Sequence, residues 1–593
     1  MALRAAVILI VSGFCACCAD DVVRPGAPEL DRPTLTALGI KLPVSGDDNH
    51  NASVAVQYRR AGTEAWRQAL PLYRVRPETV RGWNVEPQFS GSIFDLRPGV
   101  SYEIELRITD PDENVDQTLA LSATTRAVPG DPASPSEVDV DSAAGFRAAL
   151  AAAKPGDVIK LAAGAYDGPF TVRAAGTAEN PIVIRGAGQE ETILDGGGCE
   201  SCNVMEAYGA GFVHIERLTI QNANRGLRFQ TANAEGNVVR RVRIRNTRLG
   251  IGARENQKDF YIADNILEGR LAWPSAYTDD NGARSNDDGI LVQGFGHVIC
   301  HNRISGYGDA MKVQQDGSRA VDFYGNEVLS AYDNGVELDT SEANARCLRN
   351  RFTNTYATLS VQPVYGGPAY LIRNVAVNVV HEQMKFHALG GTPPREANGI
   401  FAWHNTFVSA GSALNLETSD PTHHFVVANN LFVGGARPSN GRTVNWTGPI
   451  DDGVFDYNGY APDGGFTLNL PAALGGYSRF PNFAAMQRAG VETHGVLLGP
   501  PIFANGLAAP DGYRTALEPW DAPLDPASNA IDRGMTLANV NDGFAGAAPD
   551  LGALESGCPA PLYGPRPEGM DESNQPIGCE SPAEIPASGP AGG

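Results

Sequence analysis

Short runs of alternating residues dominate the middle of the chain. Six runs between residues 289 and 417 align without gaps, and their second and fourth positions are always apolar. Because alternate residues of a strand face opposite sides, we expect these positions to fill a core. They are Ile290, Val292, Met311, Val313, Val336, Leu338, Leu359, Val361, Met384, Phe386, Leu414 and Leu416.

The third and fifth positions of the same runs are expected to face outward. If successive runs stack as neighbouring parallel strands, they lie about 4.8 Å apart. Lys312 is then a neighbour of Glu337, and Lys385 lies about 10 Å from Glu337. The first outward column holds Leu291, Lys312, Glu337, Ser360, Lys385 and Asn415, and the second holds Gln293, Gln314, Asp339, Gln362, His387 and Glu417.

An asparagine repeat accompanies these runs, and its regular part has a period of 24 residues. A period near 24 with no helix between the strands is typical of one coil of a right-handed parallel β-helix, in which stacked amides hydrogen-bond along the axis. We therefore predict an all-β fold with such a β-helix over residues 137–557. The asparagines are interpreted as a structural ladder, not a site: Asn265, Asn302, Asn326, Asn350, Asn374, Asn405 and Asn430.

Other segments border the predicted β-helix. Residues 28–126 alternate as a small β-sandwich would, residues 127–136 are a proline-rich linker, and residues 558–593 form a tail rich in Pro and Gly. A short amphipathic helix with Phe146 and Leu150 on one face is expected to cap the first coil. An open end would otherwise expose core and strand edges.

The N-terminus has the features of an export signal. Arg4 precedes an apolar run, and small residues follow up to Ala19, which is typical of a signal peptide over residues 1–19. The run is too short to anchor the chain across a bilayer, and no later segment resembles a membrane span. We expect a secreted, periplasmic or cell-surface protein. Lipoprotein anchoring through Cys15, Cys17 or Cys18 is the alternative.

The remaining six cysteines suit an oxidising compartment. Cys558 and Cys579 could form a disulfide that closes the tail. Cys199 and Cys202 form a CxxC motif, interpreted as a loop disulfide or two free thiols because two further zinc ligands are missing nearby. Cys300 and Cys347 fall at different offsets in the repeat, so we do not expect them to pair with each other.

The net charge of −22 limits the partners of the chain. Duplex nucleic acid needs a basic surface, so we expect no nucleic-acid partner. An anionic polysaccharide needs only a local basic region. We therefore expect a monomer that binds such a glycan.

The two outward columns are the candidate functional site. They mix both signs of charge with amides and histidine, whereas a merely solvated strand face is usually rich in Thr and Ser. For any single residue the solvated interpretation stays open. Loops add Asp309, Asp333 and Tyr365, and earlier coils add Arg228 and Arg254. A long coil over residues 273–284 is either a groove wall or an ordinary loop.

Several sequence segments resemble those found in the pectate-lyase-like superfamily of carbohydrate-active β-helices. They are the capping helix, Gly-Asp-Val-Ile-Lys-Leu at residues 156–161 and Ala-Pro-Asp-Leu-Gly-Ala-Leu-Glu at residues 548–555. Residues 96–102 are similar to the tyrosine-corner stretch of fibronectin type III domains, which serve as spacers or binding modules.

Glu337 and Asp339 are similar to the paired calcium ligands of chondroitinase B and related alginate lyases. This resemblance implies a Ca²⁺ site, to which Asp309 and Asp333 could add hard oxygen ligands. The catalytic Lys and Arg of that family are not matched, since Asn344 and Gln362 fall near those places.

We expect a polysaccharide lyase that cleaves a uronate-containing chain by β-elimination. This reaction needs a neutralised carboxylate, a base and an acid. One alternative is an inverting glycoside hydrolase that pairs Glu337 with another carboxylate. The other is a non-catalytic glycan-binding solenoid. For the lyase, the base is Lys312, Lys385 or His387, the acid is Tyr365, and the substrate contacts are Arg228, Arg254, Gln314, Gln362 and Asn415.

Overall fold

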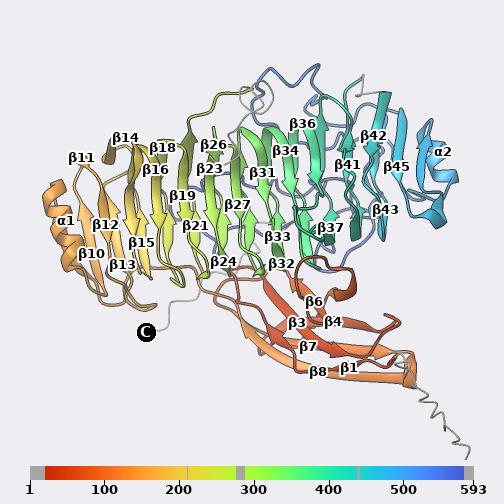
Figure 1. The fold of residues 1–593 in the computed structure, drawn as a ribbon, viewed down its shortest axis with the longest axis horizontal. Coiled ribbons are helices and arrows are strands. Elements are labelled where there is room, and N and C mark those ends of the chain that lie inside the picture. The colour runs from red at the N-terminus through yellow and green to blue at the C-terminus, as the bar shows by residue number, and fades with distance from the viewer. Residues whose placement is uncertain (1–19, 210, 275–286, 437–440, 580–593) are drawn as a thin grey trace, which may run out of the picture.

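The structure is a computed structural model, and it describes residues 20–209, 211–274, 287–436 and 441–579. Nearly all regular structure is β, which confirms the predicted fold class (Figure 1). No helix within these ranges is long and apolar enough to cross a membrane. The predicted signal peptide and lipoprotein cysteines, and residues 275–286 of the long coil, lie outside the described residues.

The N-terminal module is an antiparallel eight-stranded sheet, consistent with a β-sandwich. Its path is β1-β3-β6-β5-β4-β7-β8, and β2 pairs with β3. Tyr102 OH accepts a 2.9 Å hydrogen bond from the backbone N–H of Arg97. The fibronectin type III assignment stays a prediction. The strands are β1 (Arg24–Pro25), β2 (Glu29–Leu30), β3 (Leu38–Ser45), β4 (Ser53–Arg60), β5 (Arg67–Val75), β6 (Gln88–Ile93), β7 (Ser101–Asp110) and β8 (Val115–Thr124), with 3₁₀ turns η1 (Pro77–Thr79) and η2 (Asp112–Asn114).

Residues 136–497 wind into a parallel β-helix, whose largest sheet has 18 strands and carries the first predicted column from Leu291 to Lys385. The spacing of apolar residues explains this, since every core position named above is buried. Its strands are β11 (Gly164–Asp167), β12 (Phe170–Val172), β14 (Thr192–Ala207), β16 (Thr219–Phe229), β18 (Arg243–Thr247), β19 (Leu249–Ala253), β22 (Ile266–Gly269), β23 (Asp288–Val292), β26 (Arg303–Ser305), β27 (Asp309–Val313), β30 (Glu327–Val328), β31 (Ala331–Glu337), β34 (Arg351–Ser360), β36 (Val375–Lys385), β38 (Thr406–Ser409), β41 (Leu431–Val433), β44 (Gly459–Ala461) and β47 (Val496–Leu497).

A second parallel sheet, of 13 strands, and two sheets of four strands complete the coils. The 13 strands are β9 (Ser136–Val140), β10 (Asp157–Leu161), β13 (Ile182–Gly186), β15 (Val213–Glu216), β17 (Val238–Arg240), β21 (Tyr261–Ala263), β25 (Val298–Cys300), β29 (Asp322–Tyr324), β33 (Ala345–Leu348), β35 (Ala369–Ile372), β37 (Ala397–Trp403), β40 (Thr422–Ala428) and β43 (Gly453–Asp456). The smaller sheets are β20 (Gln257–Lys258), β24 (Gly294–Phe295), β28 (Ser318–Arg319) and β32 (Ser341–Ala343), and β39 (Leu414–Leu416), β42 (Arg442–Trp446), β45 (Gly465–Asn469) and β46 (Tyr477–Phe480).

The asparagine ladder runs through the turns that precede the strands of the large sheet. Every predicted member is fully buried, and each Nδ2 donates to Oδ1 of the next member at 2.9 to 3.0 Å. Asn458 extends the ladder by one coil. There Nδ2 of Asn458 donates to Oε1 of Glu492 at 2.7 Å, so a glutamate ends the series.

Both ends of the β-helix are covered. Helix α1 (Ala143–Ala152) buries Phe146 and Leu150 in the core, as predicted, and Ser142 caps its N-terminus. Helix α2 (Phe483–Arg488) and the 3₁₀ turn η5 (Ala472–Leu474) lie at the other end (Figure 1).

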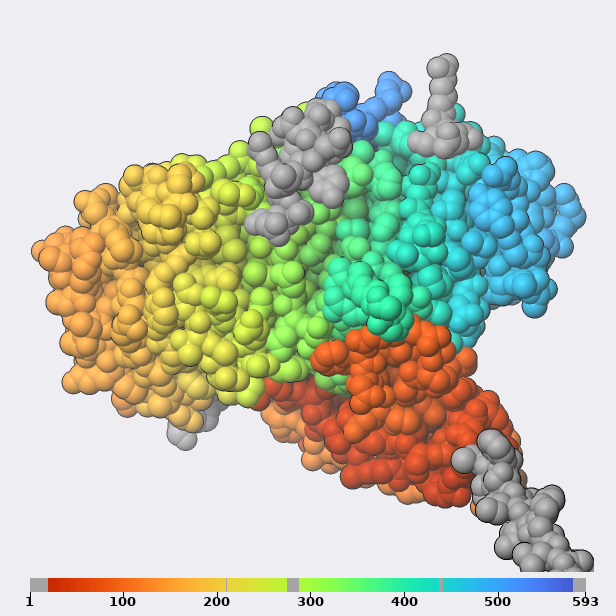
Figure 2. Space-filling view, in the orientation of Figure 1, coloured from red at the N-terminus to blue at the C-terminus, as the bar shows by residue number. Residues whose placement is uncertain are grey.

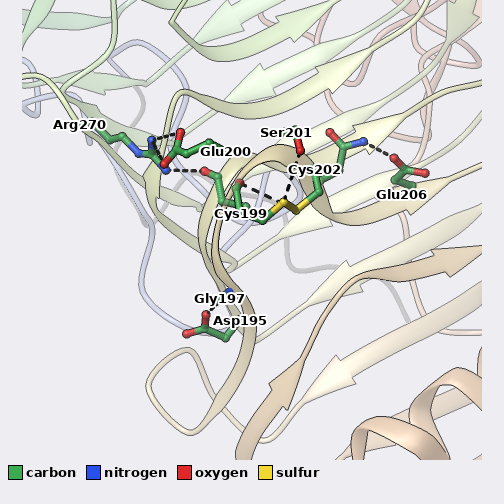
Figure 3. Close-up of a disulfide and its surroundings, with 10 residues drawn as sticks. Asp195, Gly197, Cys199, Glu200, Ser201, Cys202, Glu206 and Arg270 are labelled. Carbon is green, nitrogen blue, oxygen red and sulfur yellow. Dashed lines mark hydrogen bonds and ion pairs between the residues drawn. A yellow bond between two sulfur atoms is a disulfide. The ribbon is translucent and has the colours of Figure 1, made fainter.

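Disulfides close two surface segments. Cys558 pairs with Cys579 across the tail. Cys199 pairs with Cys202 inside the long strand β14, where Arg270 holds the adjacent Glu200 at 2.9 Å (Figure 3). The remaining two, Cys300 and Cys347, are buried and free, as the repeat offsets indicated.

The N-terminal module packs against the flank of the β-helix (Figures 1 and 2). Apolar clusters, ion pairs and hydrogen bonds all contribute to this interface. Arg319 pairs with Asp31 at 2.7 Å, and Arg346 Nη1 donates to Ser92 Oγ at 2.9 Å. Because these groups are half-buried or buried, the module has a defined orientation relative to the coils.

Candidate active site

The register of the large sheet brings the first outward column together. Cα partners run from Leu291 to Lys312, from Lys312 to Glu337, from Glu337 to Ser360 and from Ser360 to Lys385. The column is therefore as predicted across five coils. Ser360 is the smallest side chain in it and separates Glu337 from Lys385 along the column.

Lys312 is enclosed by carboxylates. Its Nζ lies 2.8 Å from Asp288 Oδ1, 2.9 Å from Asp309 Oδ2 and 3.9 Å from Glu337 Oε2, and only 5% of its side chain is exposed. Burial opposes its charge, but the neighbouring carboxylates outweigh burial and raise the pKa of Lys312. An ammonium held in this way is a counter-ion, so the structure does not support its predicted role as a base.

Asn334 links Asp309 to Glu337. Its Nδ2 lies 3.0 Å from Asp309 Oδ1 and 2.7 Å from Glu337 Oε1. Burial, followed by repulsion from Asp309 and Asp339, raises the pKa of Glu337 well above the ordinary range. Glu337 therefore holds its proton more tightly than an exposed glutamate does, and its side chain retains 13% exposure toward solvent.

Two further carboxyls have raised pKa values. Burial and then Asp309 raise the pKa of Asp333 to about 7. Burial raises the pKa of Asp339 to about 6, although Lys385 opposes the shift. Oδ1 of Asp339 accepts hydrogen bonds from Ser360 Oγ at 2.9 Å and from the Gln362 N–H at 2.7 Å.

Lys385 lies near the carboxyl cluster of Asp333, Glu337 and Asp339. In the column it is separated from Glu337 by Ser360. Among the described residues its ammonium makes no ion pair within 4.0 Å. Burial lowers the pKa of Lys385, but Asp333, Asp339 and Glu337 outweigh it and raise the value to about 12. Lys385 is thus a charged, unpaired cation beside three carboxyls.

His387 is held by a buried carboxylate. Its Nε2 lies 2.9 Å from Glu382 Oε1, and His381 Nδ1 lies 3.7 Å from the same oxygen. Burial opposes ionisation of Glu382, but the two histidines outweigh it and lower its pKa to about 2. The hydrogen bond to Glu382 raises the pKa of His381. His381 lies on the same strand as Lys385, β36, and His387 follows the end of that strand by two residues.

Tyr365 lies away from the carboxyl cluster. Its ring is fully buried and stacks on Trp83 of the N-terminal module at 5.3 Å, and its hydroxyl contacts Asp316 and Arg395. The sequence placed a phenol near the outward face, but a proline-led turn after β34 carries the ring under the module. The structure does not bring Tyr365 into position to serve as the acid.

Arg228 and Arg254 lie on earlier coils of the same face. Arg228 pairs in register with Gly252, which pairs with Leu291 of the column. Burial and then the charges of Arg254 and Arg225 lower the pKa of Arg228. Among the described residues, none of these three arginines has a carboxylate within 4.0 Å. They form an unneutralised basic cluster, of which the sequence analysis missed Arg225.

The other three predicted substrate-binding residues, Gln314, Gln362 and Asn415, differ in whether their side chains are free to bind a ligand. Gln314 is exposed. Gln362 is half-buried, and its Nε2 donates to Ala388 O at 3.2 Å. Asn415 belongs to the separate four-stranded sheet, where Asn445 Nδ2 donates to its Oδ1 at 2.9 Å. Of the three, Gln314 is the one whose side chain is free to meet a ligand without losing a hydrogen bond.

The predicted calcium ligands do not converge on one point. Asp309 is engaged by Lys312, Glu337 by Asn334 and Asp339 by Ser360. Among the residues that the structure describes, no group of three or more His, Cys, Asp or Glu side chains is arranged to hold a metal ion. As they stand, these carboxylates do not fit a Ca²⁺ site. Calcium binding stays a prediction, and no step below uses it.

Comparisons with known proteins add little. No family model and no curated protein matches the chain. Among solved structures, one similar chain is titled "Crystal structure of alginate lyase from Paenibacillus sp. str. FPU-7". It is 16% identical, with a TM-score of 0.32, over 51% of this chain and 94% of that one. A likeness this weak carries no argument about function.

Proposed function

We propose that the chain is an exported enzyme that degrades a uronate-containing polysaccharide, as a lyase acting by β-elimination. One observation carries the proposal. Asp333, Glu337 and Asp339 have raised pKa values and lie beside the unpaired Lys385 on an outward face. Perturbed carboxyls next to a free cation mark a site that handles protons and anions.

The cations would bind the substrate. The charged Lys385 faces a uronate carboxylate and stabilises the negative charge that develops as C5 loses its proton. The basic cluster of Arg225, Arg228 and Arg254 would hold another carboxylate of the same chain. Arg228 lies four coil steps from Glu337, which is about 19 Å along the axis.

The carboxyls would move the protons. Asp333, whose pKa of about 7 leaves a large ionised fraction at neutral pH, takes the C5 proton. Glu337, whose raised pKa favours the protonated form, gives its proton to the leaving glycosidic oxygen as the C4–O bond breaks and the C4–C5 double bond forms. Lys312 stays charged and keeps Asp288 and Asp309 in place.

An inverting glycoside hydrolase is the second candidate, and the raised pKa of Glu337 favours it equally. Glu337 would protonate the glycosidic oxygen, and Asp333 or Asp339 would activate a water molecule. This reaction has no need of an unpaired ammonium, so Lys385 favours the lyase.

A substrate screen tests the proposal. Uronate-containing and neutral polysaccharides are incubated with the protein, and products are followed by ultraviolet absorbance and by reducing ends. A lyase produces both signals from uronates, whereas a hydrolase produces reducing ends alone. Retention of a polysaccharide without either signal would instead show a glycan-binding solenoid.

A further inference from the structure

The N-terminal module borders the candidate face along one edge. Gly317 and Tyr365 each follow the outward columns by three residues, after Gln314 and Gln362, and both pack against Trp83. A Cβ on Gly317 would lie 2.8 Å from a ring carbon of Trp83. The edge of the face and the loop of residues 76–85 therefore form one continuous surface.

A hairpin follows His387 and rises at the same edge. Backbone hydrogen bonds of 2.9 and 3.0 Å join Leu389 and Arg395, and residues 390–394 between them are exposed. Figure 2 shows the teal part of the β-helix bulging directly onto the red N-terminal module. Strand β36, which ends at Lys385 just before His387, thus leads into a projection that the module touches.

The loop of residues 76–85 contacts the base of this hairpin. Arg395 Nη1 donates to Tyr365 OH at 3.0 Å, and the Tyr365 ring stacks on Trp83. Gly82 has a φ of +73°, and a Cβ there would lie 2.3 Å from Cγ of Arg395. Only glycine suits that backbone and that close approach. The contacts of Gly82 with Arg395 and of Trp83 with Tyr365 therefore determine the position of the hairpin.

Arg81 is a largely exposed cation of this loop that makes one long ion pair. Its side chain is 52% exposed, and its nearest carboxylate is Glu396, at 4.0 Å. Other arginines of the interface, such as Arg319 and Arg349, are closely paired with carboxylates of the module. In a protein of net charge −22, an exposed arginine beside the hairpin is a local anion-binding group.

We propose that the loop of residues 76–85 is part of the glycan-binding site. Arg81 binds a carboxylate of the polysaccharide next to the hairpin, and Trp83, acting through Tyr365, is a positioning residue for Arg395 and the hairpin. The inference rests on the proposed function. It makes the N-terminal module a determinant of substrate binding instead of a spacer.

Affinity electrophoresis of the full chain tests this inference. Gels contain polygalacturonate or alginate, and every protein carries Glu337→Gln so that the polymer is not degraded. We expect Arg81→Glu to weaken retardation by roughly tenfold, since a charge-assisted contact becomes a repulsion. The matched control is Arg60→Glu, the same charge change at an exposed position of the same module, and it should stay within about twofold.

A second pair of variants tests the positioning role. In the active enzyme, Trp83→Ala should raise KM with little change in kcat, and Trp83→Phe should restore KM by keeping the ring contact. If the parent protein is retarded and Arg81→Glu behaves like Arg60→Glu, the inference is wrong while the proposed function stands. If the parent is not retarded and the wild-type enzyme does not cleave a polyuronate, both fail.

Discussion

The Asn334 amide lies 2.7 Å from Oε1 of Glu337 and 3.0 Å from Oδ1 of Asp309, so a neutral side chain separates two carboxyls. On the other side of Asp309 stands Lys312, at 2.9 Å. The cluster is therefore layered. The inner carboxylates Asp288 and Asp309 pair with Lys312, whereas Glu337 lies on the outward column with a raised pKa.

This layering predicts different roles for the two lysines. Lys312→Met leaves Asp288 and Asp309 buried without their counter-ion, which should cost about 3–5 kcal/mol of unfolding free energy. Lys385→Met, at a side chain with no ion pair within 4.0 Å, should cost less stability than Lys312→Met and lower kcat by about 10²-fold or more. Denaturant unfolding and kinetics on both variants measure this. Equal destabilisation by the two would contradict the layered cluster.

The raised pKa of Asp333 predicts a pH-dependent cost of keeping this carboxyl buried. A carboxyl with a higher pKa in the folded than in the unfolded chain binds its proton more tightly when folded. Its contribution to stability is present below about pH 4 and is lost as pH rises through about 7. Asp333→Asn should therefore be more stable than the wild type by about 1–3 kcal/mol at pH 8, with a smaller gain at pH 5.

Unfolding curves of both proteins at the two pH values test the prediction. A gain that is the same at pH 5 and pH 8 would show that the Asp333 carboxyl is not the source. The same variant should lose activity, because it removes the proposed base.

The basic cluster predicts salt-dependent binding of long substrates. Arg228→Ala should raise KM for the polymer by roughly tenfold and weaken the dependence of KM on ionic strength, since a carboxylate loses its partner. Short oligosaccharides that cannot reach from Glu337 to Arg228 should be unaffected. Arg488→Ala, at an exposed arginine of α2, is the control and should match the wild type.

Chelation tests the calcium prediction. The proposed chemistry uses Lys385 to neutralise the uronate, so we expect activity to survive prolonged treatment with EDTA followed by desalting. Loss of activity that added Ca²⁺ restores would show that a metal ion works at this site. In that case the carboxylates around Glu337 must rearrange to bind it.

Residue patterns predicted the coils well, for a physical reason. A period-two alternation over short strands fixes which side chains are buried, and so Lys312, Glu337 and Lys385 could be placed in one column. The pattern says nothing about contacts made by loops. Tyr365 follows a strand closely in sequence, yet its ring is held by Trp83, whose position depends on how the N-terminal module docks.

The sequence predicted which residues lie in the outward column better than it predicted what each side chain does there. Lys312 and Lys385 occupy equivalent positions, but Asp288 and Asp309 enclose only the first. Whether a lysine is a counter-ion or a free cation depends on the rotamers of neighbouring side chains, which sequence spacing does not determine. Arg225 was missed although it lies on the same strand as Arg228, because strict alternation puts two residues that are three apart on opposite faces.

The most direct test of the central claim is product formation by the wild type and by Glu337→Gln on uronate-containing polysaccharides. The account predicts that the wild type generates unsaturated, ultraviolet-absorbing ends. It predicts that Glu337→Gln, which keeps the hydrogen-bonding shape but cannot give up a proton, is folded and at least about 10²-fold slower. Undiminished activity in Glu337→Gln would contradict the assignment of the site. Reducing ends without ultraviolet absorbance would contradict the lyase.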